Sequence, residues 1–269
     1  MRPLLAVDGD SFAHRAYHAL PKSIRLNAVV GFSNMLLGLW EAEQPRAVLV
    51  GWDSIGSPTY RNEAFEAYQS GRVFEESLLE QLDLLPELVN AIGFAVAKAP
   101  GYEADDFLAA AVASEQKRRG ETLVATSDRD LFQLASKRTT ILQPVRGVSE
   151  IARIGPNEVR ERYGVEPEQV PDFIALRGDP SDRLPGAAGI GPKKAADILR
   201  EHGDLEGALA AGRFTAEAED LRLYRRIAAL DASAPLPPLA DLTPTWAEAS
   251  SLVRGWGLNQ LADRLEKLA

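Results

Sequence analysis

The acidic residues of five short segments are the side chains of this sequence that could do chemistry together. They are Asp8; Asp53; Glu103, Asp105 and Asp106; Asp128 and Asp130; and Asp179 and Asp182. A single acid beside a strand or at a helix start can equally serve as a turn residue or a helix cap. Carboxylates crowded into one place repel one another unless a cation or a proton lies between them. Five such segments in one chain therefore indicate a site that binds cations.

The ligand types in this chain restrict which cation it can bind. The sequence has no cysteine, so a metal ion must be bound through oxygen or histidine. Carboxylate oxygens favour Mg²⁺ or Mn²⁺, which often keep water ligands and bridge to substrate phosphates. His14 and His18 have the i and i+4 spacing of one helix face, but no third ligand accompanies them, so zinc is disfavoured. Two hard ions roughly 4 Å apart would support phosphodiester hydrolysis without a protein nucleophile.

Short apolar runs predict the strands that position these acids. They are residues 4–7, 47–50, 94–97, 122–125 and 139–142. Helical patterns such as 78–92 and 104–118 separate them, and this alternation predicts an α/β fold with a mostly parallel sheet. The carboxyl ends of parallel strands lie along one rim of an open sheet, where ligands bind. Asp8, Asp53 and Asp128 follow predicted strands, so we expect them to meet at that rim.

The strand pattern is lost from about residue 156 onward. Glycine-rich connections between helical segments follow, most clearly at residues 186–194, and predict a second, all-helical region. We therefore divide the chain into an α/β domain over residues 1–165 and a helical domain over residues 166–269. Within the latter, residues 233–238 read as an extended connector and residues 246–268 return to helical spacing. Trp246 and Trp256 in this tail are expected to pack in a core.

Composition and charge limit the function classes. The chain has 269 residues, of which 45% are hydrophobic and 26% charged, as in an ordinary globular protein. No apolar run approaches the ~20 residues that span a bilayer, so we expect a cytoplasmic protein with no membrane partner. The net charge of −9 argues by itself against a nucleic-acid partner, because phosphates are bound by Lys and Arg. Cations bound at the acidic segments would offset this charge locally and leave basic residues elsewhere to face a substrate.

Five motifs occur in the order that is typical of bacterial and phage 5′-3′ exonucleases and flap endonucleases. They are Asp8-Gly-Asp-Ser-Phe; Tyr60-Arg61 with Tyr68-Gln-Ser-Gly-Arg72; Gly101-Tyr-Glu-Ala-Asp-Asp106; Thr126-Ser-Asp-Arg-Asp130; and Gly178-Asp-Pro-Ser-Asp-Arg-Leu-Pro-Gly186 with Gly189-Ile-Gly-Pro-Lys193. Over nearly its whole length the chain resembles the 5′-nuclease domain of DNA polymerase I. The polymerase part is absent, so the resemblance implies a stand-alone nuclease.

This resemblance implies a fold, a substrate and a division of the acids. The fold would be a PIN-like α/β nuclease domain with an arch near residues 60–85, followed by a helical region with a helix-three-turn-helix element. The substrate would be DNA with 5′ flaps, nicks, gaps or other single-strand to double-strand junctions, cut by a nucleoid-associated protein that we expect to be a monomer. By resemblance, Asp8, Asp53, Glu103 and Asp105 serve mainly the first metal ion, Asp128, Asp130, Asp179 and Asp182 mainly the second, and Asp106 lies close to both.

The predicted DNA contacts lie in two segments. Glycines in residues 186–194 let backbone amides approach a phosphate, and a proline and two lysines open the next helix. The same loop can also be an ordinary turn between packed helices; in the family its carbonyls hold a K⁺ ion as well. Arginines and aromatics of the arch suit a threaded single strand, or belong to an ordinary amphipathic helix. The predicted DNA-binding residues are Tyr17, Arg61, Tyr68, Arg72, Gly189, Gly191, Lys193 and Lys194.

One position departs from the family pattern. Gln69 stands where relatives usually have Lys beside this tyrosine, and there a cation would neutralise the scissile phosphate. Arg72, Lys22 or Arg15 could compensate for the missing cation. The candidate catalytic residues are Arg72, Arg61 and Lys22. The alternative function is therefore a flap- or junction-binding protein with weak or lost catalysis. A third interpretation, a PIN-type ribonuclease, is disfavoured by the glycine- and lysine-rich helical element.

Overall fold

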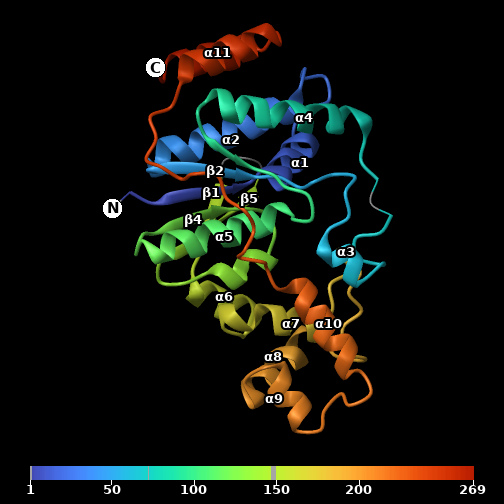
Figure 1. Ribbon diagram of the computed structural model, residues 1–269. Helices are drawn as coiled ribbons and strands as arrows, with labels where there is room; N and C mark the ends of the chain where they lie inside the picture. Colours follow the sequence, from blue (N-terminus) through green and yellow to red (C-terminus); the bar gives the residue numbers. More distant parts are fainter. Residues whose placement is uncertain (1, 72, 147–149) are drawn as a thin grey trace.

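A six-stranded sheet lies at the centre of the computed structural model, which describes residues 2–71, 73–146 and 150–269 (Figure 1). The strands are β1 (Leu4–Asp8), β2 (Ala47–Gly51), β3 (Ala95–Ala97), β4 (Thr122–Ala125), β5 (Thr139–Arg146) and β6 (Glu150–Ile154). Their order is β3-β2-β1-β4-β5-β6, and all neighbours are parallel except β5 and β6. The predicted mostly parallel sheet is confirmed. Strand β6 was not predicted, because this edge strand is largely accessible and has no apolar run.

Alternate side chains of each strand supply the two faces of the sheet. On β1, Leu5 and Val7 join one core cluster, whereas Leu4 and Ala6 join the other. The first face is covered by α1 (Gly9–Ala19), α2 (Asn27–Glu43) and α4 (Glu76–Ala91). The second is covered by α5 (Ala104–Lys117), η1 (Asp130–Leu134) and α6 (Pro156–Tyr163). Because strands buried on both faces read as continuous apolar runs, four of the five predicted strands begin at the predicted residue.

The helical region continues from the α5 side of the sheet. Its elements are η2 (Pro167–Gln169), α7 (Val170–Arg177), α8 (Pro192–His202), α9 (Leu205–Ala210) and α10 (Ala218–Ala228). Helix α7 packs against both α8 and α10, and its buried Phe173 and Ile174 share one core cluster with Val124 and Ile141 of the sheet. The predicted helical region is confirmed for these residues, and its core is continuous with that of the sheet.

The C-terminal tail does not belong to this helical region. Helices α11 (Trp246–Gly255) and α12 (Asn259–Glu266) pack on the opposite side of the molecule, where α11 contacts α4 (Figure 1). The Trp246 ring is 5% exposed and packs edge-on against Trp40 and Phe94, with ring centroids 4.7 and 6.0 Å away. Trp256 is half-buried against the same cluster, as expected. Residues 166–269 therefore do not form one packing unit, because the apolar face of α11 is buried on the first domain.

The predicted arch is shorter than residues 60–85. Helix α3 (Tyr60–Ala64) is followed by turns, and α4 begins at Glu76 with Leu78, Leu82 and Leu85 buried in the core. We call residues 60–75 the arch segment; Arg72 lies outside the described residues. None of the helices within the described ranges is long and apolar enough to cross a membrane.

Candidate active site

A cavity of about 660 Å³ lies at the carboxyl ends of the parallel strands. Seven of the nine predicted metal ligands line it: Asp8, Asp53, Glu103, Asp105, Asp128, Asp130 and Asp179. Asp10 lines it too, although sequence analysis did not select it. The sequence could have indicated Asp10, because it lies two residues after Asp8 in the same motif. We call this the acidic cavity.

The first acids are held by backbone amides at strand ends. Asp8 ends β1 and caps α1, accepting the Ser11 amide at 2.9 Å. Asp10 accepts the Asp53 amide at 2.7 Å, and Asp53 in turn accepts the Ala104 amide at 2.8 Å. The helix-cap interpretation and the ligand interpretation therefore both apply to Asp8. Each hydrogen bond from a backbone amide fixes one carboxylate oxygen, and the carboxylates can still face the cavity.

A threonine links the strand ends β1 and β4. Thr126 is fully buried and donates its hydroxyl to Asp8 at 2.8 Å, while its Oγ1 accepts the Asp128 amide at 2.9 Å. Asp128 then accepts the Asp130 amide at 2.8 Å. Thr126 was not predicted as a positioning residue, because a threonine before an acidic pair has no distinctive spacing.

A tight loop between α7 and α8 presents Asp179. Gly178 and Gly186 have φ of 78° and 73°, and a Cβ at Gly186 would lie 2.3 Å from the backbone nitrogen of Gly178. This close approach requires glycine at both positions. Asp179 accepts the Ser181 amide at 2.8 Å and pairs with Arg177 at 3.2 Å. Asp182 does not line the acidic cavity; its carboxylate accepts the Gln69 side-chain amide at 3.1 Å.

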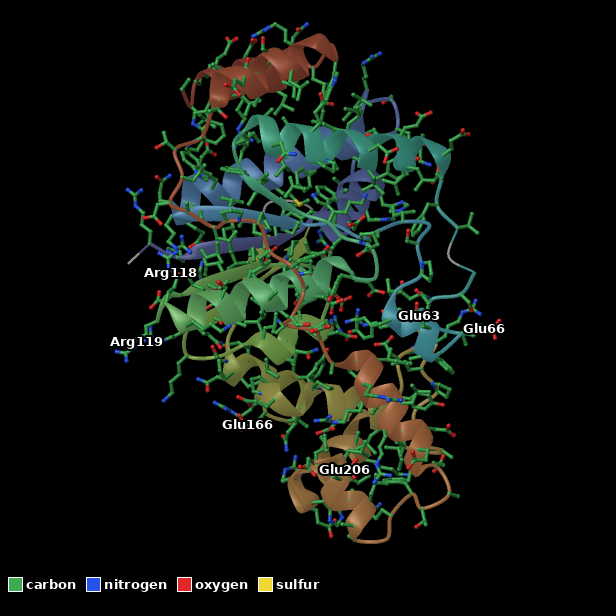
Figure 2. All side chains as sticks on the ribbon, viewed as in Figure 1. Glu63, Glu66, Arg118, Arg119, Glu166 and Glu206 are labelled. Carbon is green, nitrogen blue, oxygen red and sulfur yellow. The ribbon has the colours of Figure 1, made fainter. Side chains whose placement is uncertain are left out.

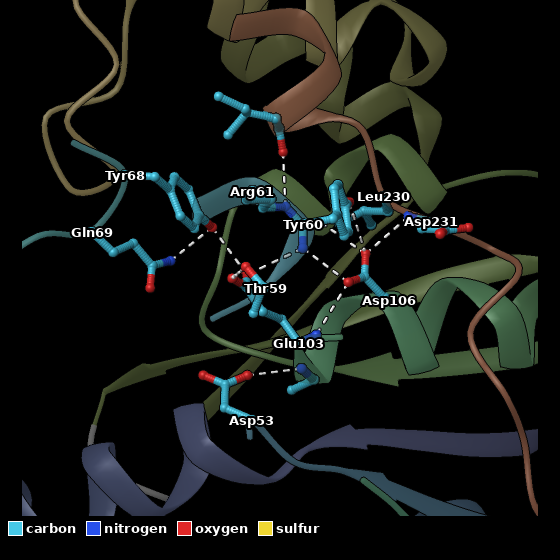
Figure 3. A network of polar contacts seen from close by, with 12 residues as sticks. Asp53, Thr59, Tyr60, Arg61, Tyr68, Gln69, Glu103, Asp106, Leu230 and Asp231 are labelled. Carbon is cyan, nitrogen blue, oxygen red and sulfur yellow. Dashed lines mark hydrogen bonds and ion pairs between the residues drawn. The ribbon is translucent and has the colours of Figure 1, made fainter. Parts of the chain in front are cut away.

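Glu103 is held from the arch segment and the residue before it (Figure 3). Its Oε1 accepts the Thr59 hydroxyl at 3.1 Å, and its Oε2 accepts the Tyr68 hydroxyl at 3.0 Å. Arg61 lies 3.3 Å from the same Oε2. Gln69 donates to the Tyr68 hydroxyl at 2.8 Å and lines the acidic cavity as a neutral amide. The arch segment thus fixes a candidate metal ligand directly.

Asp106 and Arg61 form a buried ion pair, which corrects two predictions. The exposed fractions of their side chains are 0% and 2%, and the guanidinium donates to both carboxylate oxygens at 2.8 and 2.9 Å (Figure 3). Arg61 also donates to the Ile227 carbonyl at 2.9 Å, and Asp106 accepts the Asp231 amide at 2.9 Å. Asp106 is therefore not a metal ligand in this arrangement, and Arg61 cannot contact DNA, because both are saturated inside the protein.

Three further predicted residues have structural contacts instead of positions on the acidic cavity. Tyr17 is 2% exposed and its hydroxyl donates to Glu75 at 2.9 Å. Lys22 pairs with Glu75 at 2.5 Å and does not line the cavity. Tyr68 is 3% exposed and bound to Glu103. The structure therefore gives no support to Tyr17 and Tyr68 as DNA-binding residues or to Lys22 as a catalytic cation, because the two rings are buried and Lys22 is paired away from the cavity.

The glycine-rich loop before α8 is accessible, as its predicted contacts with DNA require. Gly189 (φ 71°), Gly191, Lys193 and Lys194 are all exposed. Lys194 donates to the Gly189 carbonyl at 3.0 Å, so a K⁺ ion at that carbonyl would compete with the ammonium group. Helix α8 begins at Pro192, directly after the loop. The amides at this helix start remain candidates for phosphate contacts.

Burial and mutual repulsion raise the pKa of five acids of the cavity. Burial raises the pKa of Asp8 and of Glu103 to about 7, with Asp53 adding to both shifts. Burial also raises the pKa of Asp10, Asp105 and Asp130 well above its ordinary value, and neighbouring carboxylates add to it. Within the described residues no three acids or histidines converge as a ready-made metal site. The oxygen-only lining nevertheless fits hard cations, which would relieve this repulsion and complete their shell with water.

These raised pKa values predict how pH and metal ions affect stability. A carboxylate whose folded-state pKa lies above its unfolded value stabilises the fold at low pH and loses that effect as pH rises through about 7. We therefore expect the melting temperature of the protein in EDTA to fall by on the order of 5–10 °C between pH 5 and pH 8. Mn²⁺ should raise it more at pH 8 than at pH 5. Thermal denaturation measures both; equal stabilisation by Mn²⁺ at the two pH values would contradict the metal-site assignment.

The buried Arg61–Asp106 pair predicts a large loss of stability when one partner is removed. Arg61→Met should lower the free energy of unfolding by about 3–5 kcal/mol, because Asp106 keeps a buried charge without its cation. The double variant Arg61→Met/Asp106→Leu should recover most of this loss. Urea denaturation measures both variants. A loss in Arg61→Met below about 1 kcal/mol, the range of surface pairs, would refute the buried-pair assignment.

The fold and the site together define the class of the protein. The protein is of the α/β class, with a mostly parallel sheet that has a carboxylate-lined cavity at its carboxyl rim and is joined to a helical region. A family model described as "5′-3′ exonuclease, N-terminal resolvase-like domain" matches residues 3–164, and one described as "5′-3′ exonuclease, C-terminal SAM fold" matches residues 165–249. The chain belongs to the 5′-3′ exonuclease family.

Individual relatives agree with this family. DNA polymerase I of Mycobacterium tuberculosis is 40% identical over 210 residues, which are 75% of this chain and 23% of the relative. The thermostable DNA polymerase I of Thermus thermophilus is 39% identical over 249 residues, 87% of this chain and 29% of the relative. The chain thus spans only about a quarter of these curated relatives.

A solved structure shares the fold over almost the full chain. A variant of the D15 flap endonuclease of bacteriophage T5, in a pseudo-enzyme-product complex with DNA and metal ions, has a TM-score of 0.72 at 20% identity. The match covers 99% of this chain and 98% of that one. At this identity the likeness shows the fold alone.

Proposed function

We propose that this chain is a structure-specific 5′ nuclease that hydrolyses DNA phosphodiesters at single-strand to double-strand junctions. The observation that carries the proposal is that carboxylates from five separate segments line one cavity at the sheet rim. Family membership supports the same activity, and the T5 structure with DNA and metal ions has the same fold. The net charge of −9 is compatible with this activity, because much of the acidic charge near the substrate lies where cations would bind.

The residues divide into two candidate groups for two Mg²⁺ or Mn²⁺ ions. We assign Asp8, Asp53, Glu103 and Asp105 mainly to one ion, and Asp128, Asp130 and Asp179 mainly to the other. When bound, such ions polarise a phosphodiester and lower the pKa of a water. The protein positions these carboxylates through backbone amides and Thr126, and Tyr68 and Thr59 orient Glu103. Asp182 could join the second group only after its contact with Gln69 opens.

A labelled 5′-flap duplex tests the proposal. We expect cleavage near the junction in Mg²⁺ or Mn²⁺ and none in EDTA, because the crowded carboxylates repel a phosphate without cations. A blunt duplex and a single-stranded RNA of equal length are the matched controls and should be cut more slowly. Intact flap DNA across a titration of both metals would refute nuclease activity.

A second function is favoured by one observation. Gln69 lines the acidic cavity as a neutral amide, at the position where a cation could face the scissile phosphate. A neutral side chain at this position is what we would expect in a flap- or junction-binding protein with weak catalysis. It would bind flap DNA tightly in Ca²⁺ and turn over negligibly in Mg²⁺.

A further inference from the structure

A second cavity lies beside the acidic cavity and carries the opposite charge. Its volume is about 550 Å³, and its walls come from the residue before η1, the ends of α6 and α7, and α8. The cations that line it are Arg129, Arg162, Arg177, Lys193 and Arg200. Asp197 is the one acidic residue of the lining and pairs with Arg200 at 2.7 Å. In a chain with a net charge of −9 this is a strong local excess of positive charge. We call it the basic cavity.

Most of these cations retain charge for a ligand. Arg162 donates at 2.8 Å to Gln143, which is neutral, and lies 5.7 Å from the Phe132 ring centroid. The Nε of Arg177 is buried and has no hydrogen-bond partner among the described residues, although its Nη2 reaches Asp179. Arg129 and Lys193 form no ion pair with another of the described residues. The basic cavity therefore keeps an excess of positive charge that an anion could neutralise.

The two cavities share a wall. Arg129 and Arg177 line both of them, so a phosphate in the acidic cavity has the basic cavity as its neighbour. Pro192 and Lys193 at the start of α8 form the far side, where the helix dipole also favours negative charge. Adjacent cavities of opposite charge suit a polyanion with several phosphates. One phosphate would bind in the acidic cavity together with metal cations, and the next would contact the arginines of the basic cavity. An acidic peptide is less suitable, because its carboxylates would be repelled by the acids of the acidic cavity and would bring no cations to that cavity.

We propose that the basic cavity binds backbone phosphates of the DNA strand that runs from the scissile phosphate toward α8. This inference rests on the proposed function, since that function supplies the DNA. Arg162 and Arg200 would contact phosphate there without lining the acidic cavity. They determine how the duplex is held, and the carboxylates determine how it is cut. Arginine suits this role because its guanidinium can donate two parallel bonds to one phosphate.

The first test measures the salt dependence of DNA binding. In Ca²⁺, Arg162→Ala/Arg200→Ala should weaken flap binding by roughly tenfold and lower the slope of log K against log salt by about 2, because each lost phosphate contact removes about 0.9. Arg162→Lys/Arg200→Lys should restore the slope. The charge-matched control is Arg118→Ala/Arg119→Ala, at the C-terminal end of α5 (Figure 2); these residues line neither cavity. A slope equal to that control, in protein that melts like the parent, would overturn the inference.

The second test locates the phosphates. Single neutral methylphosphonates are placed at each of several positions on both sides of the scissile bond. We expect one or two positions at which the substitution weakens binding by the parent protein but not by Arg162→Ala/Arg200→Ala. If each methylphosphonate weakens binding by the double variant as much as binding by the parent protein, the inference is overturned. A polyglutamate peptide is the competitor. If it displaces DNA from the parent protein but not from Arg162→Ala/Arg200→Ala, and the methylphosphonates have no effect, the ligand is an acidic protein and the inference also fails.

Cleavage separates this inference from the proposed function. If the parent protein cuts flap DNA and the double variant shows an unchanged salt slope, only the basic cavity assignment is wrong. If the parent does not cut but the slope falls as expected, only the nuclease proposal is wrong. Where both hold, the double variant should raise KM by roughly tenfold and leave kcat within about twofold, because it changes binding equally in ground and transition states.

Discussion

Asp130→Ala should lower the rate of flap cleavage at saturating DNA by about 10³-fold, while the affinity for flap DNA changes little. Asp130 lines the acidic cavity, and burial together with Asp128 and Asp179 raises its pKa well above the ordinary value. Burial and repulsion disfavour the ionised form of Asp130. We expect a bound cation to stabilise this ionised form. Single-turnover cleavage of a labelled 5′ flap in Mn²⁺ measures the rate, and fluorescence anisotropy in Ca²⁺ measures binding.

The matched control for this experiment is Asp83→Ala. Asp83 is exposed on α4, so its removal takes away the same carboxyl group without changing the acidic cavity. The control should cut at the rate of the parent protein. A variant lacking Asp130 that cuts equally well would show that the clustered acids stabilise the fold and do not catalyse hydrolysis.

Gln69→Lys should raise kcat for flap cleavage by about 10- to 100-fold with a smaller change in KM. Gln69 already lines the acidic cavity, and its amide reaches the Tyr68 hydroxyl and Asp182. A lysine there would place an ammonium group beside the position of the scissile phosphate, where it would offset the charge that develops in the transition state. Gln69 already adopts a left-handed backbone φ of 50°, and lysine has the same unbranched Cβ.

Gln69→Met is the control that separates charge from packing. It removes the amide that holds the Tyr68 hydroxyl but adds no charge, so it should not raise the rate. A large gain with lysine alone favours a weakly active protein that lost a cation at this position. An unchanged rate with lysine would show that another cation already supplies this role and that Gln69 is not the limiting feature.

The sheet and most of the acidic cavity could be predicted from sequence because both depend on local patterns. Strands buried on both faces give continuous apolar runs, and parallel strands direct their carboxyl ends to one rim. That rule correctly brought Asp8, Asp53 and Asp128 together from positions up to 120 residues apart. It could not find β6, whose accessible residues carry no such run.

Side-chain partners from distant segments could not be predicted in this way. Arg61 and Asp106 have the residue types of a DNA contact and a metal ligand, and only their packing under α10 makes them a buried pair. The same holds for Tyr68, whose hydroxyl is directed to Glu103 by the turn of the arch segment. Residue type and spacing are identical for an exposed arginine and a buried one, because burial depends on what the rest of the chain places over it.

The sequence by itself determined the α/β class, the family and seven acids of the cavity, since hydrophobic periodicity and short motifs are local properties of the chain. Only the tertiary structure decided which charged side chains face a cavity and which are buried in ion pairs. It excluded Asp106 from the cavity, added Asp10, returned the C-terminal tail to the first domain, and brought Arg129, Arg162 and Arg200 into one basic cavity. These outcomes depend on long-range packing, which fixes the distance between charges and their exposure to water, and therefore fixes their chemistry.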